Sequence, residues 1–113
     1  MDLVDDRDGQ ERLRRLRTVL GRLAVLLAGH GETHWATWAS GCAEAVGLQD
    51  PQSFERVTGA YGGMGSLSDI GLRPPSGEFD PDYLPEAEFE RLRGEAYGLA
   101  AQILADLRAQ GAL

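Results

Sequence analysis

Residues 10–28 read QERLRRLRTVLGRLAVLLA, a run in which leucine returns every three or four positions. On an α-helix this spacing brings the side chains to one face, which comprises Leu13, Leu16, Leu20, Leu23 and Leu27. Arginines occupy much of the opposite face, and Gly29 and Gly31 follow as a natural stop. The pattern predicts an amphipathic helix that buries its leucine face against the rest of a domain.

Three more helices are predicted downstream. The first covers residues 32–46, with one face made of Trp35, Trp38, Ala39, Cys42 and Val46. The second opens at Asp50, an N-cap residue type, followed by a proline at the first helical position, and ends at residues 62–63. The third runs from residue 85 to residue 111 with a long apolar stripe that includes Phe89, Leu92, Ala96, Ile103 and Leu107.

The stretch from residue 62 to residue 84 is rich in glycine and proline and is predicted to be irregular. Within it, Ser66 and Asp69 have the spacing of a capping box, which favours one helical turn from Leu67; a short strand is the alternative. No alternating β-branched run occurs anywhere in the chain. We expect a single all-α domain, a bundle of about four helices over residues 10–113, preceded by a flexible acidic lead-in at residues 1–9.

The charge is acidic and unevenly distributed. The 113 residues include 18 Asp and Glu against 11 basic residues, all of them arginine, for a net charge of −7. Residues 31–113 carry −8 of this and residues 1–30 carry +1. An acidic surface repels phosphate backbones, so DNA or RNA is not expected as a partner, whereas a basic protein is steered towards it.

Residues 12–42 loosely resemble a lipoprotein signal, because arginines precede an apolar run and a small-residue segment ends at Cys42. The polar residues 30–34 interrupt the apolar run, and the chain starts with acids where such signals carry positive charge. The run is also too short to span a bilayer. We therefore expect a cytoplasmic protein without membrane contact.

His30, His34 and Cys42 are the candidates for metal or nucleophile chemistry. A metal needs at least a third ligand, and the glycines beside His30 indicate a turn rather than a shared helix face. Cys42 lies about two helical turns from His34, too far for a shared proton, and a buried cysteine is commonly an apolar filler. We expect no metal, no cofactor and no enzymatic activity.

The segment from Tyr61 to Ser66 is the most distinctive in the chain. One interpretation is architectural: a left-handed glycine ends the preceding helix, Gly65 permits a close backbone approach, and Ser66 caps the next turn. The other is that free backbone amides here bind an anion or phosphate, with Gly62, Gly63, Gly65 and Ser66 as the binding residues. No P-loop lysine accompanies the glycines.

Acids alternate with aromatic residues between positions 78 and 90. Such a run is either a solvated face or a negatively charged patch with aromatic anchors for a basic protein. For the second interpretation the predicted partner-binding residues are Trp38, Glu78, Phe79, Asp80, Asp82, Tyr83 and Glu86.

Three motifs carry a resemblance to an uncharacterised family of small bacterial proteins. They are His34-Trp35-x-x-Trp38, the Gly-Gly-Met-Gly-Ser segment at residues 62–66, and a stretch over residues 92–100. In that family the glycine segment is commonly followed by an Asn-Asp pair, and Ser68 stands here where the Asn would be. The resemblance covers about residues 25–105 and implies no activity or catalytic residue.

The expected function is that of a small acidic module that binds and neutralises a basic protein, with an immunity protein acting against a toxin as one form. The alternatives are a small-molecule or anion binder at residues 62–66 and a self-associating structural protein. The sequence leaves open the partner and the choice between a monomer and a homodimer.

Overall fold

The computed structural model describes residues 6–62 and 65–112. Within them the chain forms four α-helices, α1 (Arg7–Gly29), α2 (Thr33–Gly47), α3 (Pro51–Gly59) and α4 (Leu84–Ala109), and one 3-10 turn, η1 (Leu67–Asp69). No strand occurs in these residues, so the strand alternative around Leu67 is wrong. The prediction of an all-α bundle with an irregular segment before the last long helix is confirmed.

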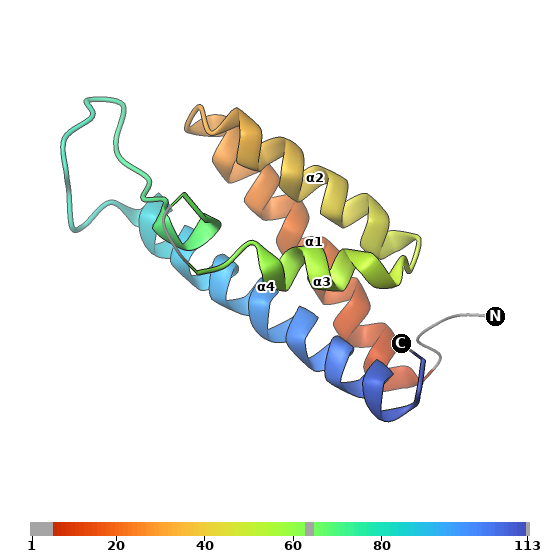
Figure 1. Ribbon diagram of the computed structural model, residues 1–113. Helices are drawn as coiled ribbons and strands as arrows, with labels where there is room; N and C mark the ends of the chain where they lie inside the picture. Colours follow the sequence, from red (N-terminus) through yellow and green to blue (C-terminus); the bar gives the residue numbers. More distant parts are fainter. Residues whose placement is uncertain (1–5, 63–64, 113) are drawn as a thin grey trace.

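The two longest helices, α1 and α4, lie side by side and antiparallel (Figure 1). Helix α2 packs along α1, while α3 contacts both α4 and α2. At about 1.5 Å per residue a helix of 26 residues such as α4 is about 39 Å long. The molecule is accordingly elongated, at 49 × 24 × 22 Å. None of the helices in the described ranges is both long enough and apolar enough to cross a bilayer.

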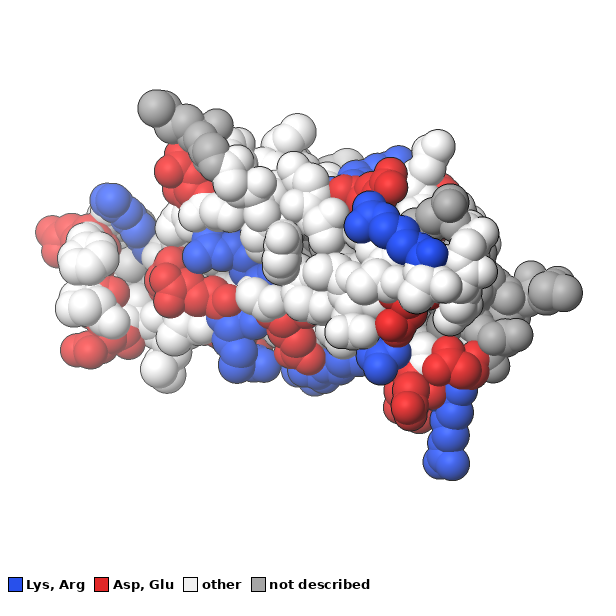
Figure 2. Space-filling model, turned by 60° about the horizontal axis from the view of Figure 1, so that its bottom comes forward, with Lys and Arg blue, Asp and Glu red and all other residues white. Residues whose placement is uncertain are grey.

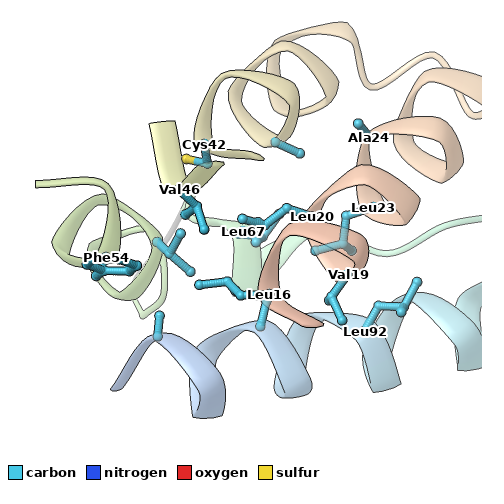
Figure 3. Packing of buried hydrophobic residues seen from close by; sticks show 14 of the residues in the cluster. Leu16, Val19, Leu20, Leu23, Ala24, Cys42, Val46, Phe54, Leu67 and Leu92 are labelled. Atoms are coloured by element: carbon cyan, nitrogen blue, oxygen red, sulfur yellow. The ribbon is translucent and has the colours of Figure 1, made fainter. Parts of the chain in front are cut away.

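The core is a continuous apolar cluster to which every helix contributes (Figure 3). All five predicted leucines of α1 are buried, and α3 adds Phe54 and Val57. Helix α4 contributes the predicted stripe and, in addition, Ala100. Helix α1 is the centre of this packing because α2 and α4 cover it from two sides.

The buried face of α2 differs from the prediction. Its buried residues are Ala36, Ala39, Cys42 and Val46, whereas Trp35 and Trp38 are only half-buried. Small side chains in the middle of the contact let two helix backbones approach closely, so the large indole rings cover its edge instead. Cys42 is fully buried among apolar neighbours, as expected of an apolar filler.

Two helix boundaries also differ from those predicted from the sequence. Helix α1 begins at Arg7 rather than at residue 10, and Gly9 is buried, so the helical domain reaches into the expected lead-in; residues 1–5 lie outside the described residues. Helix α3 ends at Gly59, because the chain tightens there through a hydrogen bond from the Tyr61 amide to the Thr58 carbonyl. Tyr61 therefore follows the helix instead of belonging to it.

The ends of α1 and α2 share one backbone pattern. After α1, the amides of Gly31 and Glu32 donate to the carbonyls of Ala28 and Leu27, and Gly31 adopts a left-handed φ of 76°. After α2 the left-handed position is held by Gln49, with a φ of 56°, and not by the glycine predicted as the stop at residue 47. A glycine next to a helix end thus marks the end without always supplying its geometry.

A forked ion pair joins α1 to α4. Arg15 donates from Nε to Glu95 Oε2 at 2.5 Å and from Nη2 to Oε1 at 2.9 Å. The hydrogen bonds from Arg15 are the main reason that the pKa of Glu95 is lowered, against the opposing effect of burial. A second ion pair, between Arg12 and Asp106 at 2.9 Å, joins the same two helices nearer to the start of α1 and the end of α4.

We predict that Leu20→Ala lowers the free energy of unfolding by about 3 kcal/mol, because it leaves a cavity at a fully buried position of α1. Val25→Ala on the same helix is the control, since Val25 is 76% exposed, and it should change stability by less than about 0.5 kcal/mol. Urea unfolding of both variants measures the difference. Equal losses would contradict the packing described for α1.

We predict a pH-dependent effect for Glu95→Gln. The lowered pKa of Glu95 means that its ionised form stabilises the fold above the ordinary pKa of a glutamate, about 4.3, and that this contribution is lost as the pH falls through the lowered value. The variant should be less stable than the parent by about 1 kcal/mol at pH 7, and the gap should close progressively below about pH 4.5.

Urea unfolding at pH 7, 5 and 3 checks this, with Glu90→Gln as the control. Glu90 lies on the same helix, is exposed, and has no ion pair with a described residue. A gap for Glu95→Gln that stayed constant from pH 7 to pH 3 would show that the pair with Arg15 does not stabilise the fold.

Candidate functional site

The segment between η1 and α4 projects from one end of the helix bundle (Figure 1). Residues 76–82, which we call the acidic loop, are all exposed. The loop carries four of the predicted partner-binding residues, Glu78, Phe79, Asp80 and Asp82. In Figure 2 acidic side chains flank uncharged ones at the corresponding end of the molecule.

Phe79 is the exposed apolar residue at the centre of the acidic loop. It is 76% exposed, and acids stand on both sides of it, at positions 78 and 80. An aromatic ring in water has most of its apolar area still to bury, and interface anchors are of this kind. Phe79 and its neighbours therefore combine an apolar anchor with negative charge.

Two local turns shape the acidic loop. The Gly77 amide donates to the Pro74 carbonyl at 2.9 Å, and Gly77 has a left-handed φ of 78°. Asp80 Oδ1 accepts from the Asp82 amide at 2.9 Å, an Asx turn that uses part of the Asp80 carboxylate. The carboxylates of Glu78 and Asp82 have no partner within the described part of the chain. These two acids are the ones that remain available to a partner.

The segment is held to the bundle on both sides of the acidic loop. On one side, a carboxylate oxygen of Glu86 in the first turn of α4 accepts from the Leu72 amide. On the other, Tyr83 Oη donates to His30 Nε2 at 2.6 Å, because His30 Nδ1 donates to the Leu26 carbonyl at 2.8 Å and the second nitrogen of a neutral ring accepts. Loop residues fastened in this way lose less entropy when a partner orders them.

These two contacts revise the roles expected for Tyr83 and Glu86. Both side chains are half-buried and bond within the protein, so they position the acidic loop instead of extending its exposed surface. Trp38 lies on α2, where its ring contacts Trp35 at a centroid distance of 5.4 Å, and the ring contacts of the described residues include none between Trp38 and the loop. The structure therefore brings together four of the seven predicted residues as one exposed group.

The glycine segment is architectural in the part that the structure describes. Gly62 and Gly65 have left-handed φ angles of 87° and 78°, and their amides donate to Ser68 Oγ and to Asp69 Oδ2. A Cβ at Gly65 would meet no atom within 4 Å, so backbone conformation and not close approach accounts for that glycine. Gly63 belongs to the predicted anion site but lies outside the described residues.

The expected capping box is only partly formed. Ser66 occupies the N-cap position of η1 without a side-chain hydrogen bond to its amides, and Asp69 reaches back to the Gly65 amide at 3.1 Å. The amides of Gly62 and Gly65, which the anion interpretation requires, are thus already used, and one of them by a carboxylate. This arrangement disfavours an anion at the described part of the segment.

Arg93 of α4 fastens η1, which directly follows the glycine segment, and this role was not predicted from the sequence. Its Nη1 donates to the carbonyls of Leu67 and Ile70, both at 3.1 Å, and of Ser68 at 3.4 Å. Tyr61 Oη in turn donates to the Arg93 carbonyl at 2.5 Å. Burial raises the pKa of Tyr61, which keeps this donor protonated.

An open groove of about 590 Å³ lies beside this segment, between the end of α3 and α4. Tyr61 and Tyr97 stand edge to face along it, with a centroid distance of 5.0 Å. This groove is the place where a small molecule would meet the glycine segment.

The structure does not assemble the metal or nucleophile sites considered above. Burial raises the pKa of the Cys42 thiol, whereas His34 is exposed and packs its ring against Trp35 at 5.1 Å. His30 caps the end of α1 through its bond to the Leu26 carbonyl. Among the residues in the described ranges, no three His, Cys, Asp or Glu side chains are grouped as a metal would need.

The comparisons with known proteins give one family. Residues 28–79 match the model of a domain of unknown function, DUF6966. This supports the expectation of an uncharacterised family, over a shorter range than residues 25–105: the tryptophan helix and the glycine segment fall inside it, and residues 92–100 fall outside. Comparison with curated proteins and with solved structures gives no match.

We predict that Tyr83→Phe frees one side of the acidic loop without changing the fold. The variant should lose about 1 kcal/mol of stability, since one hydrogen bond between half-buried groups disappears, and hydrogen exchange of the amides at residues 82–86 should accelerate. Tyr97→Phe is the matched control, because Tyr97 is 45% exposed and its hydroxyl bonds to no described residue. If the two variants behaved alike, the bond to His30 would not be what holds the loop.

Proposed function

We propose that this protein is a non-enzymatic module that binds a basic protein through the acidic loop. The observation that carries the proposal is the exposure of Phe79 on a projecting segment, between Glu78 and Asp82, whose carboxylates bond to no residue in the described ranges. The negative charge steers a basic partner into contact, and the phenyl ring supplies apolar area for it to bury.

The charge distribution and the loop anchors support the same proposal. Residues 31–113 carry a charge of −8, so a basic protein is attracted over a distance of about 10 Å at ordinary ionic strength. The bonds of Tyr83 and Glu86 hold the loop in position before binding, which reduces the entropy lost on association. We extend the proposal to a bacterial, cytoplasmic immunity protein that neutralises a toxin, by analogy of size and charge.

A small molecule in the groove beside Gly62 is the second candidate function. The observation that favours it is the pair of tyrosine rings at the groove, with Arg93 beside them. Because any ligand of the folded state raises its melting temperature, a thermal-shift screen of aromatic and phosphate-bearing compounds separates this candidate from the first.

We predict that reversing the charges of the acidic loop abolishes partner capture. The parent, immobilised and exposed at low salt to a lysate of the cells that encode it, should retain a basic protein that the Glu78→Arg, Asp82→Arg double variant does not retain. With the purified partner, the association rate should fall at least tenfold at low salt, and the difference should shrink as salt is added.

The control is the Glu44→Arg, Glu90→Arg double variant, which changes the net charge equally at exposed positions of α2 and α4 that form no ion pair with a described residue. It should retain the partner with a smaller loss of association rate. Phe79→Ser should leave the association rate nearly unchanged and raise the dissociation rate. If the acidic-loop variant bound the same partner as fast as the parent, the proposal would be wrong.

A further inference from the structure

A second recess is separate from the groove at the glycine segment and is lined in part by residues that flank the acidic loop in the sequence. It has a volume of about 490 Å³ and lies between the turn that joins α1 to α2 and the start of the projecting segment. The turn contributes Gly29, His30 and Glu32, residues 71–75 form the opposite wall, and Tyr83 completes it. We call this recess the turn pocket.

Glu32 contributes to the turn pocket a carboxylate that bonds to no residue in the described ranges. It is half-buried and stands at the N-cap position of α2, yet its side chain makes no capping hydrogen bond. Its carboxylate has no hydrogen bond or ion pair with any residue that the structure describes. A partly desolvated carboxylate without a partner is unfavourable, and a cation that enters the pocket relieves that cost.

The other charged and polar groups around the turn pocket act in both directions. The carbonyl end of α1 contributes the negative end of its dipole, whereas the start of α2 places a positive dipole end beside Glu32. His30 uses both ring nitrogens, for the Leu26 carbonyl and for Tyr83, and so offers an anion no free donor. Glu86 adds negative charge at Leu72, while Arg73, which is part of the pocket wall, adds positive charge and donates from Nη1 to the Gly77 carbonyl at 3.4 Å.

The walls of the turn pocket fit a long side chain as well as its charge. Pro74 and Pro75 provide an apolar surface on one side, and the ring of Tyr83 provides another. Such surfaces bury the methylene groups of an arginine or lysine, and an aromatic ring also attracts the cationic head. A small hydrated metal ion would make no use of these walls.

We propose that the turn pocket receives a positively charged side chain of the protein partner, with its head group on the carboxylate of Glu32 and its methylene groups against Pro75 and Tyr83. This inference rests on the proposed function, since it assigns the cation to the same basic partner that the acidic loop attracts. Tyr83 lines the pocket and also fastens the acidic loop, so it connects the two proposed contact regions.

The experiment is an NMR titration of the full chain with N-acetyl-arginine methylamide, monitored at the amides of the turn and of residues 71–73. These amides should shift in a saturable way in the millimolar range. The citrulline analogue, which has the same shape without the charge, should bind at least fivefold more weakly. Glu32→Gln should weaken binding of the arginine compound at least fivefold, whereas Glu44→Gln, at an exposed position of α2, should leave it unchanged.

Equal binding of the arginine and citrulline compounds, no effect of Glu32→Gln, or shifts confined to residues 78–82 would each overturn the assignment of the turn pocket. Glu32→Gln is expected to fold normally, because the Glu32 carboxylate bonds to no described residue and the backbone hydrogen bonds of Glu32 are kept, and an unchanged melting temperature verifies this. The titration needs no partner, so its failure leaves the acidic loop proposal standing. Conversely, charge reversal in the loop can fail to affect partner capture while the pocket still binds the probe.

Discussion

The burial of the leucine face of α1 is the constraint on which the rest of the structure depends. That face is too wide for one partner helix, so α2 covers one side of it and α4 the other. Because α2 carries the chain back along α1, away from the end of the bundle where α4 begins, α3 with η1 has to return it to that end (Figure 1). The segment between η1 and α4 projects from the end of the bundle and carries the candidate site.

Polar contacts act together with the burial of Leu72 in the core to position the projecting segment. Arg93 donates hydrogen bonds to three carbonyls around η1. The Glu86 carboxylate accepts from the Leu72 amide, and His30 accepts from the Tyr83 hydroxyl. An irregular backbone has polar groups that a helix would satisfy internally, and each of these side chains supplies a missing partner. The exposed acids and Phe79 can then vary in chemistry without disturbing the core.

Much of the fold could be predicted from short-range patterns. The spacing of leucines in α1 and the Asp50-Pro51 start of α3, where Asp50 Oδ1 accepts from the Gln52 amide, are signals that a local window contains. The positioning contacts could not be predicted in this way. His30 and Tyr83 are 53 positions apart, and a tyrosine tied to a histidine looks the same in sequence as one left exposed for a partner.

Glu86 illustrates the same limit for charges. In the sequence it is one acid in a row of acids, and only the three-dimensional structure shows that its carboxylate bonds to a backbone amide 14 positions away while Glu78 stays exposed. The half-burial of Trp38 likewise depends on how closely α1 and α2 approach, which periodicity does not specify. A pattern of residue types predicts which face of a helix a side chain lies on. Its structural role depends on the residue that it contacts there, which the pattern does not specify.

The range matched by the family model, residues 28–79, has a consequence for how such proteins are built. It contains α2, α3 and η1 but neither α1, except for its last two residues, nor α4. Isolated from them, the matched segment would expose Ala39, Phe54 and Leu67 to water and would lose the guanidinium that fastens η1. A polypeptide that shares only this portion must therefore obtain a hydrophobic support of equivalent shape from elsewhere, whether from its own flanks or from another subunit.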